Sequence, residues 1–282
     1  LPLNAVLAWA LSGGHLGFAQ MGAAGAALAT LVAAALGALG MAVAVWTLPQ
    51  ARARGVRAVV GTDVARLMQG VIRLFVFGGM PAMAAALEIA GFALVIGLST
   101  RLGDAVAHAY QIVFSIHNVT FAVAIGFGSA AGVRAGNAVG EGEAGAATMR
   151  VAVALALALA TTGMLVLALI VARLLIVAAF PATDEVHQLA AAMLTLWAPF
   201  ILFDSTQMVL ASALRSLGDQ VIAGINSIIA FFGVTGGAGW LLVHWGYGAT
   251  GLVMASAAGM VAAAALHGAR FWQVSARSRL KS

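Results

Sequence analysis

The chain has 282 residues, of which 63% are hydrophobic and 8% are charged, with a formal net charge of +5. A soluble globular domain carries about 45–50% apolar and about 25% charged residues, so this composition excludes an ordinary soluble domain and indicates a bilayer protein. The absence of cysteine excludes disulfides, thiolate metal sites and cysteine nucleophiles.

Eight stretches of the chain are apolar enough to cross a membrane. A spanning helix needs about 20 mostly apolar residues. We expect such helices near residues 1–20, 22–47, 69–99, 105–133, 148–180, 186–214, 219–245 and 248–272.

The basic residues are distributed unevenly between the two sides that these segments define. Twelve of the 14 Lys and Arg residues fall on one side, and only Arg101 and Arg173 fall on the other. Short cytoplasmic loops are enriched in Lys and Arg. We therefore expect a multi-pass protein of the bacterial cytoplasmic (inner) membrane with a cytoplasmic C-terminus, and we see no reason to expect nucleic acid as a partner.

The first two segments resemble the last two. Residues 4–9 (NAVLAW) and 22–25 (GAAG) are similar to residues 226–231 (NSIIAF) and 248–251 (GATG). This match predicts a six-helix repeat, of which the second copy is complete and the first keeps its last two helices. We therefore expect a twelve-helix parent that has lost its first four helices. The alternative is a chance recurrence in a chain rich in Ala and Gly.

Two of the nine acidic residues lie inside predicted spans. Glu88 is near the middle of the third segment and Asp204 near the middle of the sixth. An acid at this depth costs several kcal/mol, and it is tolerated mainly where it lines a cavity, pairs with a partner or binds an ion. We expect no Lys or Arg at comparable depth, so the pattern favours a coupling site for H⁺ or Na⁺. The alternative is a protonated carboxyl group in a helix–helix hydrogen bond.

An aromatic and polar stripe surrounds the second acid. Trp197, Phe200, Asp204 and Gln207 are spaced by 3, 4 and 3 residues, which places them on one helix face. A carboxylate among aromatic rings suits a lipophilic cation. The alternative is ordinary aromatic packing.

A polar stripe with the same spacing occupies the fourth segment. Its members are His108, Gln111, Ser115 and Asn118. We expect it to face water or a cavity, with His108 either an interfacial histidine or a proton relay. His117 points off this stripe, and it receives no role.

Five short motifs, in their order and spacing, resemble the C-terminal two-thirds of the multidrug and toxic compound extrusion (MATE) family of antiporters. They are GMP at 79–81 followed by Glu88, AHAYQI at 107–112, VRAGNAVGEG at 133–142, FDSTQ at 203–207 and LRSLGD at 214–219. The resemblance covers the whole chain. It implies two six-helix lobes around a central cavity and the efflux of cationic drugs driven by Na⁺ or H⁺. In one branch of the family a Glu and an Asp form the cation site, and these match Glu88 and Asp204.

Two positions depart from the family pattern. Relatives often have a proline in the fourth segment where this chain has Ala124, which removes the basis for a kink. A tyrosine one turn before the Asp in some Na⁺-coupled relatives is Phe200 here. The missing hydroxyl weakens the case for Na⁺ and leaves H⁺ open.

The sequence thus predicts an all-α polytopic membrane protein with the six-helix C-terminal lobe and the last two N-terminal-lobe helices of a twelve-helix MATE-type fold. We divide it into the N-terminal-lobe helices (1–47), a basic cytoplasmic inter-lobe linker (48–68), the C-terminal lobe (69–275) and a basic cytoplasmic tail (276–282).

The predicted function is secondary-active antiport, in which cationic or lipophilic drugs leave in exchange for H⁺ or Na⁺ by alternating access. Glu88 and Asp204 are the predicted coupling residues, and the predicted Na⁺ ligands if Na⁺ is the coupling ion. The predicted substrate cavity comprises Trp197, Phe200, Gln207, Gln111, Ser115 and Asn118. We expect no enzymatic activity, no cofactor beyond the coupling ion, and a functional monomer at full length.

Three alternatives stay open. A lipid-linked saccharide flippase of a related bundle fold should line its cavity with several basic residues. An intramembrane enzyme would need a nucleophile–base pair or a two-metal cluster. A truncated remnant would not transport at all.

Overall fold

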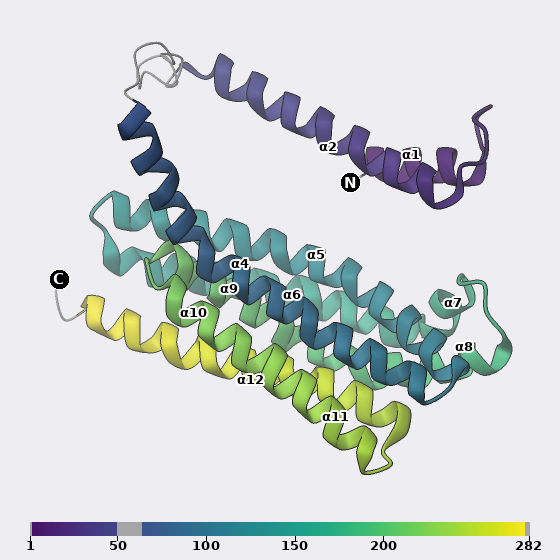
Figure 1. Ribbon diagram of the computed structural model, residues 1–282. Coiled ribbons are helices and arrows are strands. Elements are labelled where there is room, and N and C mark those ends of the chain that lie inside the picture. The colour runs from purple at the N-terminus through teal and green to yellow at the C-terminus, as the bar shows by residue number, and fades with distance from the viewer. Residues whose placement is uncertain (1, 50–63, 280–282) are drawn as a thin grey trace. The chain divides into compact units, whose positions relative to one another are not determined.

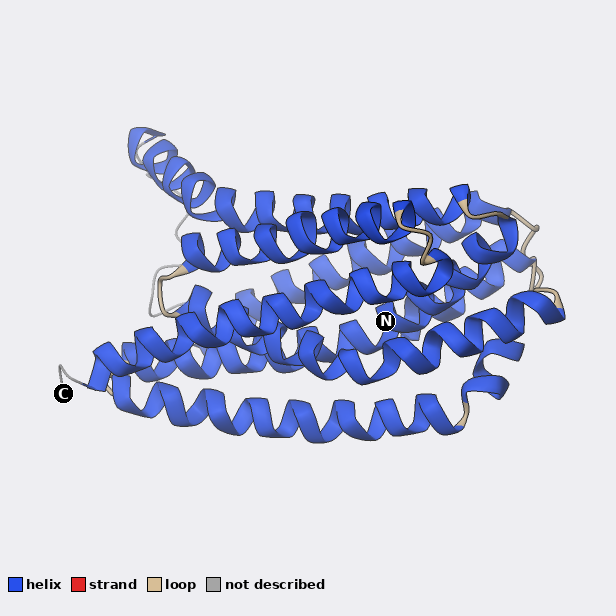
Figure 2. Ribbon diagram, turned by 90° about the horizontal axis from the view of Figure 1, so that it is seen from below, coloured by secondary structure: helices blue, strands red, loops and turns tan. Residues whose placement is uncertain are grey.

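The computed structural model describes residues 2–49 and 64–279, and all regular structure in these ranges is helical (Figures 1 and 2). The chain divides into two compact units, Leu1–Ile72 and Arg73–Ser282, and each is described by itself. Most of the predicted inter-lobe linker, with Arg52, Arg54 and Arg57, lies outside the described residues, as do the last residues of the predicted tail. The four-part division therefore stays a prediction.

The first unit contains the helices α1 (Pro2–Gly13) and α2 (Gly22–Thr47). A Cβ atom on Gly25 would lie 2.5 Å from the carbonyl oxygen of Leu11, so glycine is what allows the two helices to touch. Helix α2 is long and apolar enough to span a membrane. Helix α1 ends at Gly13, so the expected end of the first span at residue 20 is wrong.

The second unit is built from long helices and from shorter helices joined end to end. In chain order they are α4 (Val64–Arg101, beginning in the first unit), α5 (Asp104–Gly140), α6 (Ala144–Val171), α7 (Arg173–Ala178), α8 (Asp184–Trp197), the 3₁₀-helix η1 (Ala198–Phe200), α9 (Ile201–Ser216), α10 (Gln220–Ser227), the π-helix η2 (Ile228–Gly236), α11 (Gly237–His244) and α12 (Gly248–Arg279). Together with α2 they give seven candidate membrane spans among the described residues, six of which match the predicted third to eighth segments.

Two of these spans change their helix type part way along. The 3₁₀ turn η1 joins α8 to α9, and it contains Pro199, which cannot donate a backbone hydrogen bond. The π-helix η2 joins α10 to α11. Both interruptions rotate the side chains after them relative to those before them, because the number of residues per turn changes.

The interior of the second unit has two apolar clusters. One is rich in large side chains, including Tyr110, Trp197 and Phe231. The other consists largely of alanines where α5, α6 and α9 pack together, among them Ala131, Ala135 and Ala213. Small residues allow this close approach in a bilayer, where lipid offers no hydrophobic drive for helix association.

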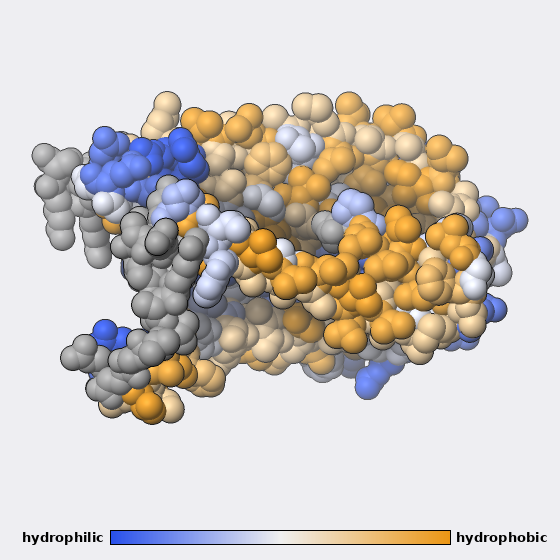
Figure 3. Space-filling view, turned by 90° about the horizontal axis from the view of Figure 1, so that it is seen from above, coloured by the Kyte–Doolittle hydropathy of each residue, from blue (hydrophilic) through white to orange (hydrophobic). Residues whose placement is uncertain are grey.

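The outer surface is apolar, as expected of a protein surrounded by lipid. Phe75 is 81% exposed and Leu175 is 78% exposed. In Figure 3 apolar side chains cover the middle of the visible face and hydrophilic ones gather towards its ends. This distribution suits helices whose ends reach water on both sides of a hydrocarbon layer.

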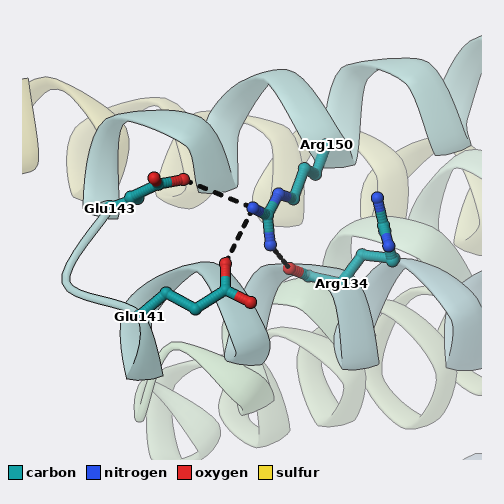
Figure 4. A network of polar contacts seen from close by, with 4 residues as sticks. All are labelled: Arg134, Glu141, Glu143 and Arg150. Atoms are coloured by element: carbon teal, nitrogen blue, oxygen red, sulfur yellow. Dashed lines mark hydrogen bonds and ion pairs between the residues drawn. The ribbon is translucent and has the colours of Figure 1, made fainter.

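Ion pairs link neighbouring helix ends on the side predicted to be cytoplasmic. Between α5 and α6, the Arg150 guanidinium donates to Glu141 at 2.9 Å and to Glu143 at 3.4 Å, and also to the carbonyl oxygen of Arg134 (Figure 4). On α12, Arg270 binds both carboxylate oxygens of Asp219 at 2.5 and 2.9 Å.

Candidate functional site

A cavity of about 500 Å³ lies inside the second unit, with its walls contributed by α4, α5 and α9. Its lining comprises Ala85, Glu88, Ile89, Phe92, Ala93, Ile96, Phe114, His117, Asn118, Phe121, Asp204, Met208 and Arg215. The two acids that the sequence places inside the membrane therefore share one space, although they come from different helices. The remaining wall is mostly apolar and aromatic, as is typical of small-molecule sites.

The Asp204 carboxylate is the most deeply buried charge-bearing group of this cavity, with 2% exposure. Its Oδ1 atom accepts a hydrogen bond of 3.1 Å from the side-chain amide of Gln207, one turn along α9. Its Oδ2 atom lies 3.8 Å from Nε2 of His117 and has no hydrogen-bond partner among the described residues. A buried acceptor left unsatisfied costs about 1–3 kcal/mol, so a proton or cation at Oδ2 would be stabilised.

His117 extends from α5 into the same cavity. Its ring is buried, with its centroid 5.3 Å from that of Trp197 and 5.8 Å from that of Phe121. The phenyl rings of Phe92 and Phe114 lie at 6.2 and 6.1 Å. The imidazole therefore occupies an aromatic enclosure whose polar side is the Asp204 carboxylate.

These contacts correct two expectations from the sequence. Asp204 has two partners, Gln207 and His117, where none was expected. His117 received no role because it lies off the polar stripe of its helix, yet its Nε2 atom lies 3.8 Å from the Asp204 carboxylate. The sequence carries no signal for this pairing, because it depends on how α5 packs against α9.

Glu88 reaches the cavity from α4 and is half-buried. It interacts electrostatically with Asp204 and with Arg215. Arg215 lies about 16 Å further along α9 than Asp204, at about 1.5 Å per residue, and donates to the Ser212 hydroxyl at 3.1 Å. The cavity thus extends from the acids to one basic residue at the helix end.

The six predicted cavity residues have different positions. Asn118 lines the cavity, and Gln207 supports it from behind through its hydrogen bond to Asp204. Trp197 is buried in the apolar core beside His117.

The other three predicted residues are not part of the cavity wall. Phe200 is half-buried and packs against Phe203, with 6.2 Å between the ring centroids. The 3₁₀ turn at Pro199 separates it from Asp204, so the predicted single face is interrupted. On α5, Gln111 is exposed, and its carbonyl oxygen accepts a hydrogen bond of 2.8 Å from the Ser115 hydroxyl.

Oxygen atoms suited to a hard monovalent or divalent cation are present in the cavity. They belong to the carboxylates of Glu88 and Asp204 and to the side-chain amide of Asn118. In the described part of the chain, no three His, Asp or Glu residues are grouped so as to hold a metal ion. The assignment of Glu88 and Asp204 as Na⁺ ligands stays a prediction.

The fold and the cavity define a class of protein: a multi-pass helical membrane protein with paired acids in an aromatic intramembrane site. A family model described as MatE matches residues 81–236, which is more than half of the chain. The chain belongs to the MatE family, as its motifs predict.

Curated relatives from bacteria support this membership. The multidrug resistance protein NorM of Burkholderia vietnamiensis is 34% identical over 278 residues, which cover 96% of this chain and 59% of that protein. The probable multidrug resistance protein NorM of Brucella suis is 29% identical over 266 residues, which cover 92% and 56%. The chain therefore spans somewhat more than half the length of these relatives.

Solved structures agree in fold. The eukaryotic MATE transporter AtDTX14 superposes with a TM-score of 0.81 at 23% identity, over 98% of this chain and 61% of that one. The Vibrio cholerae MATE transporter VcmN in its bent form superposes with a TM-score of 0.73 at 18% identity, over 99% and 61%. The predicted MATE-type fold is confirmed.

Proposed function

We propose that the intact protein exports cationic or lipophilic drugs across a bacterial inner membrane in exchange for H⁺ or Na⁺. The observation that carries this proposal is the cavity in which Glu88 and Asp204, from two different helices, lie among aromatic rings. The names of the relatives, which are multidrug resistance proteins, support drugs as the substrate class.

The chemistry of the cavity suits a drug that carries a positive charge. Carboxylates and aromatic ring faces both attract a cation, and the attraction is stronger in a site that is shielded from water. The apolar wall, with Phe92, Phe114 and Phe121, would bury the rest of a lipophilic molecule. Size and charge would therefore decide which compounds enter.

Exchange follows if drug and coupling ion compete for the same carboxylates. The unpartnered Oδ2 atom of Asp204 would accept either a proton or a metal cation, and each would weaken the binding of a cationic drug to this carboxylate. Transport then requires that the two ligands stabilise different states of the cavity, because a ligand shifts an equilibrium only through differential affinity. Alternation of access between the two membrane faces would complete the cycle.

The alternative functions have less support from the cavity. A carrier of lipid-linked saccharides would need several basic residues for phosphate, whereas Arg215 is the only Lys or Arg among the lining residues. An enzyme would need a nucleophile beside a base. No Ser, Thr, Tyr or Lys lines this cavity.

The proposal is tested with the intact protein reconstituted into vesicles. Ethidium transport is followed under an imposed H⁺ gradient, under an imposed Na⁺ gradient, and with neither. Transport that depends on one of the gradients supports antiport and identifies the coupling ion. Equal transport under all three conditions would contradict it.

A further inference from the structure

A second cavity, of about 590 Å³, lies between α4 and the span formed by η2 and α11. We refer to it as the α4–α11 groove. It shares no lining residue with the acid-bearing cavity. Nine residues line it, among them Leu94, Gly97, Arg101, Phe232, Gly237 and Trp240.

The groove lies at the end of two membrane spans. Arg101 is the last residue of one span, and Trp240 lies one turn before the end of the other at His244. Along the α-helix α4 the groove runs from Arg101 to Leu94, which is about 10 Å at about 1.5 Å per residue. One leaflet of the hydrocarbon core is about 15 Å thick, so the groove extends over most of a leaflet.

The groove is present because glycines line it at the points where side chains would otherwise fill it. A Cβ atom on Gly97 or on Gly237 would meet nothing within 4 Å. The rims are large apolar side chains, with Leu94 49% exposed, Phe232 43% and Trp240 59%. An open apolar channel of this kind, parallel to the helices in the hydrocarbon layer, fits an acyl chain.

Arg101 gives the groove a charge. It is the only charged residue among the nine that line the groove, it is exposed, and its guanidinium group has no hydrogen bond or ion pair with any described residue. By contrast Arg173, the other basic residue predicted on this side, donates to the carbonyl oxygen of Ile170 at 2.8 Å. A guanidinium group at the membrane interface matches a lipid phosphate, which it can bind through two hydrogen bonds.

We propose that the α4–α11 groove binds an anionic phospholipid, with one acyl chain along the glycines and the phosphate on Arg101. Trp240 would then lie beside the part of the acyl chain that is nearest the headgroup, at the level where tryptophan rings are enriched in membrane proteins. The proposal does not depend on drug transport, since it concerns a different cavity.

The test uses the intact protein in vesicles of phosphatidylcholine that contain brominated phosphatidylglycerol or, in a second set, brominated phosphatidylcholine. Bromine quenches tryptophan fluorescence at short range. The quenching due to Trp240 is the difference in fluorescence quenching between the unmodified protein and its Trp240→Phe variant. We expect the anionic brominated lipid to quench Trp240 at about five-fold lower mole fraction than the zwitterionic one, the effect of one basic residue near the surface.

Two variants and a matched control localise the effect. Arg101→Gln should remove the preference for the anionic lipid, whereas Arg173→Gln should keep it. Gly237→Leu should place a side chain in the groove, since a Cβ atom there would meet nothing within 4 Å, and should reduce quenching by both lipids. Equal quenching by the two lipids in the unmodified protein, a preference that survives Arg101→Gln, or no effect of Gly237→Leu would each overturn the proposal. If neither lipid quenches Trp240, the proposal is also overturned, because protein then covers the groove and excludes lipid.

Discussion

His117 and Asp204 face each other across the contact between α5 and α9, with 3.8 Å between Nε2 of the imidazole and Oδ2 of the carboxylate. Both side chains are buried, and Gln207 holds the second carboxylate oxygen. The acid is thus fixed in place by neighbours on two helices. One of its oxygens remains open to a proton or a cation.

This pairing predicts that His117 and Asp204 act as one unit in binding a cationic drug. In the intact protein, His117→Gln and Asp204→Asn should each weaken ethidium binding, measured by fluorescence titration, and the double variant should bind no more weakly than Asp204→Asn alone. The expected coupling between neighbouring residues is about 0.5–3 kcal/mol in the double-mutant cycle. His108→Gln is the control on the same helix, because His108 is exposed. Additive effects of His117→Gln and Asp204→Asn would contradict the pairing.

The contact between α4 and η2 predicts a stability effect at one glycine. A Cβ atom on Gly91 would overlap the backbone carbonyl of Phe231, and backbone cannot move aside as a flexible side chain can. Gly91→Ala should therefore destabilise the protein by about 1–3 kcal/mol, the usual cost of overpacking. Thermal unfolding in detergent measures this as a lower midpoint. Gly97→Ala is the control, since its Cβ atom would meet nothing within 4 Å; equal midpoints for both variants would refute the close approach.

The two ion pairs at the predicted cytoplasmic end should differ in strength. Arg270 binds both oxygens of Asp219 and both side chains are partly buried, whereas Arg150 binds two exposed glutamates. Exposed ion pairs contribute about 0–1 kcal/mol, so Arg150→Gln should hardly change the unfolding midpoint. Arg270→Gln should lower it more, and high salt should reduce the difference between the two variants. A larger decrease in the unfolding midpoint for Arg150→Gln than for Arg270→Gln would contradict this ranking.

Much of the fold follows from the sequence because a bilayer imposes simple rules on a helix. Length and apolarity identify six consecutive spans from α4 to α12, and the interruptions at Pro199 and in η2 do not break them. The end of the first predicted span is wrong because apolar composition alone does not show that the helix stops at Gly13 and does not continue through the glycines that follow.

The site is predictable only in part, for a physical reason. The cost of burying an acid identifies Glu88 and Asp204 without any knowledge of the fold. The aromatic wall and His117 come from the way α4, α5 and α9 pack, and a stripe on one helix does not say which face meets its neighbours. Of the residues in the two predicted stripes, only Asp204 and Asn118 line the cavity.

Asp204 is the residue that we propose to couple an ion gradient to drug export. Ethidium efflux from vesicles containing the intact protein, driven by the gradient that supports transport, measures this coupling most directly. We expect Asp204→Asn to abolish this efflux, Glu88→Gln to reduce it by less, and Asp104→Asn, at an exposed position in the first turn of α5, to leave it unchanged. Ethidium efflux by Asp204→Asn at the rate of the unmodified protein would contradict the account.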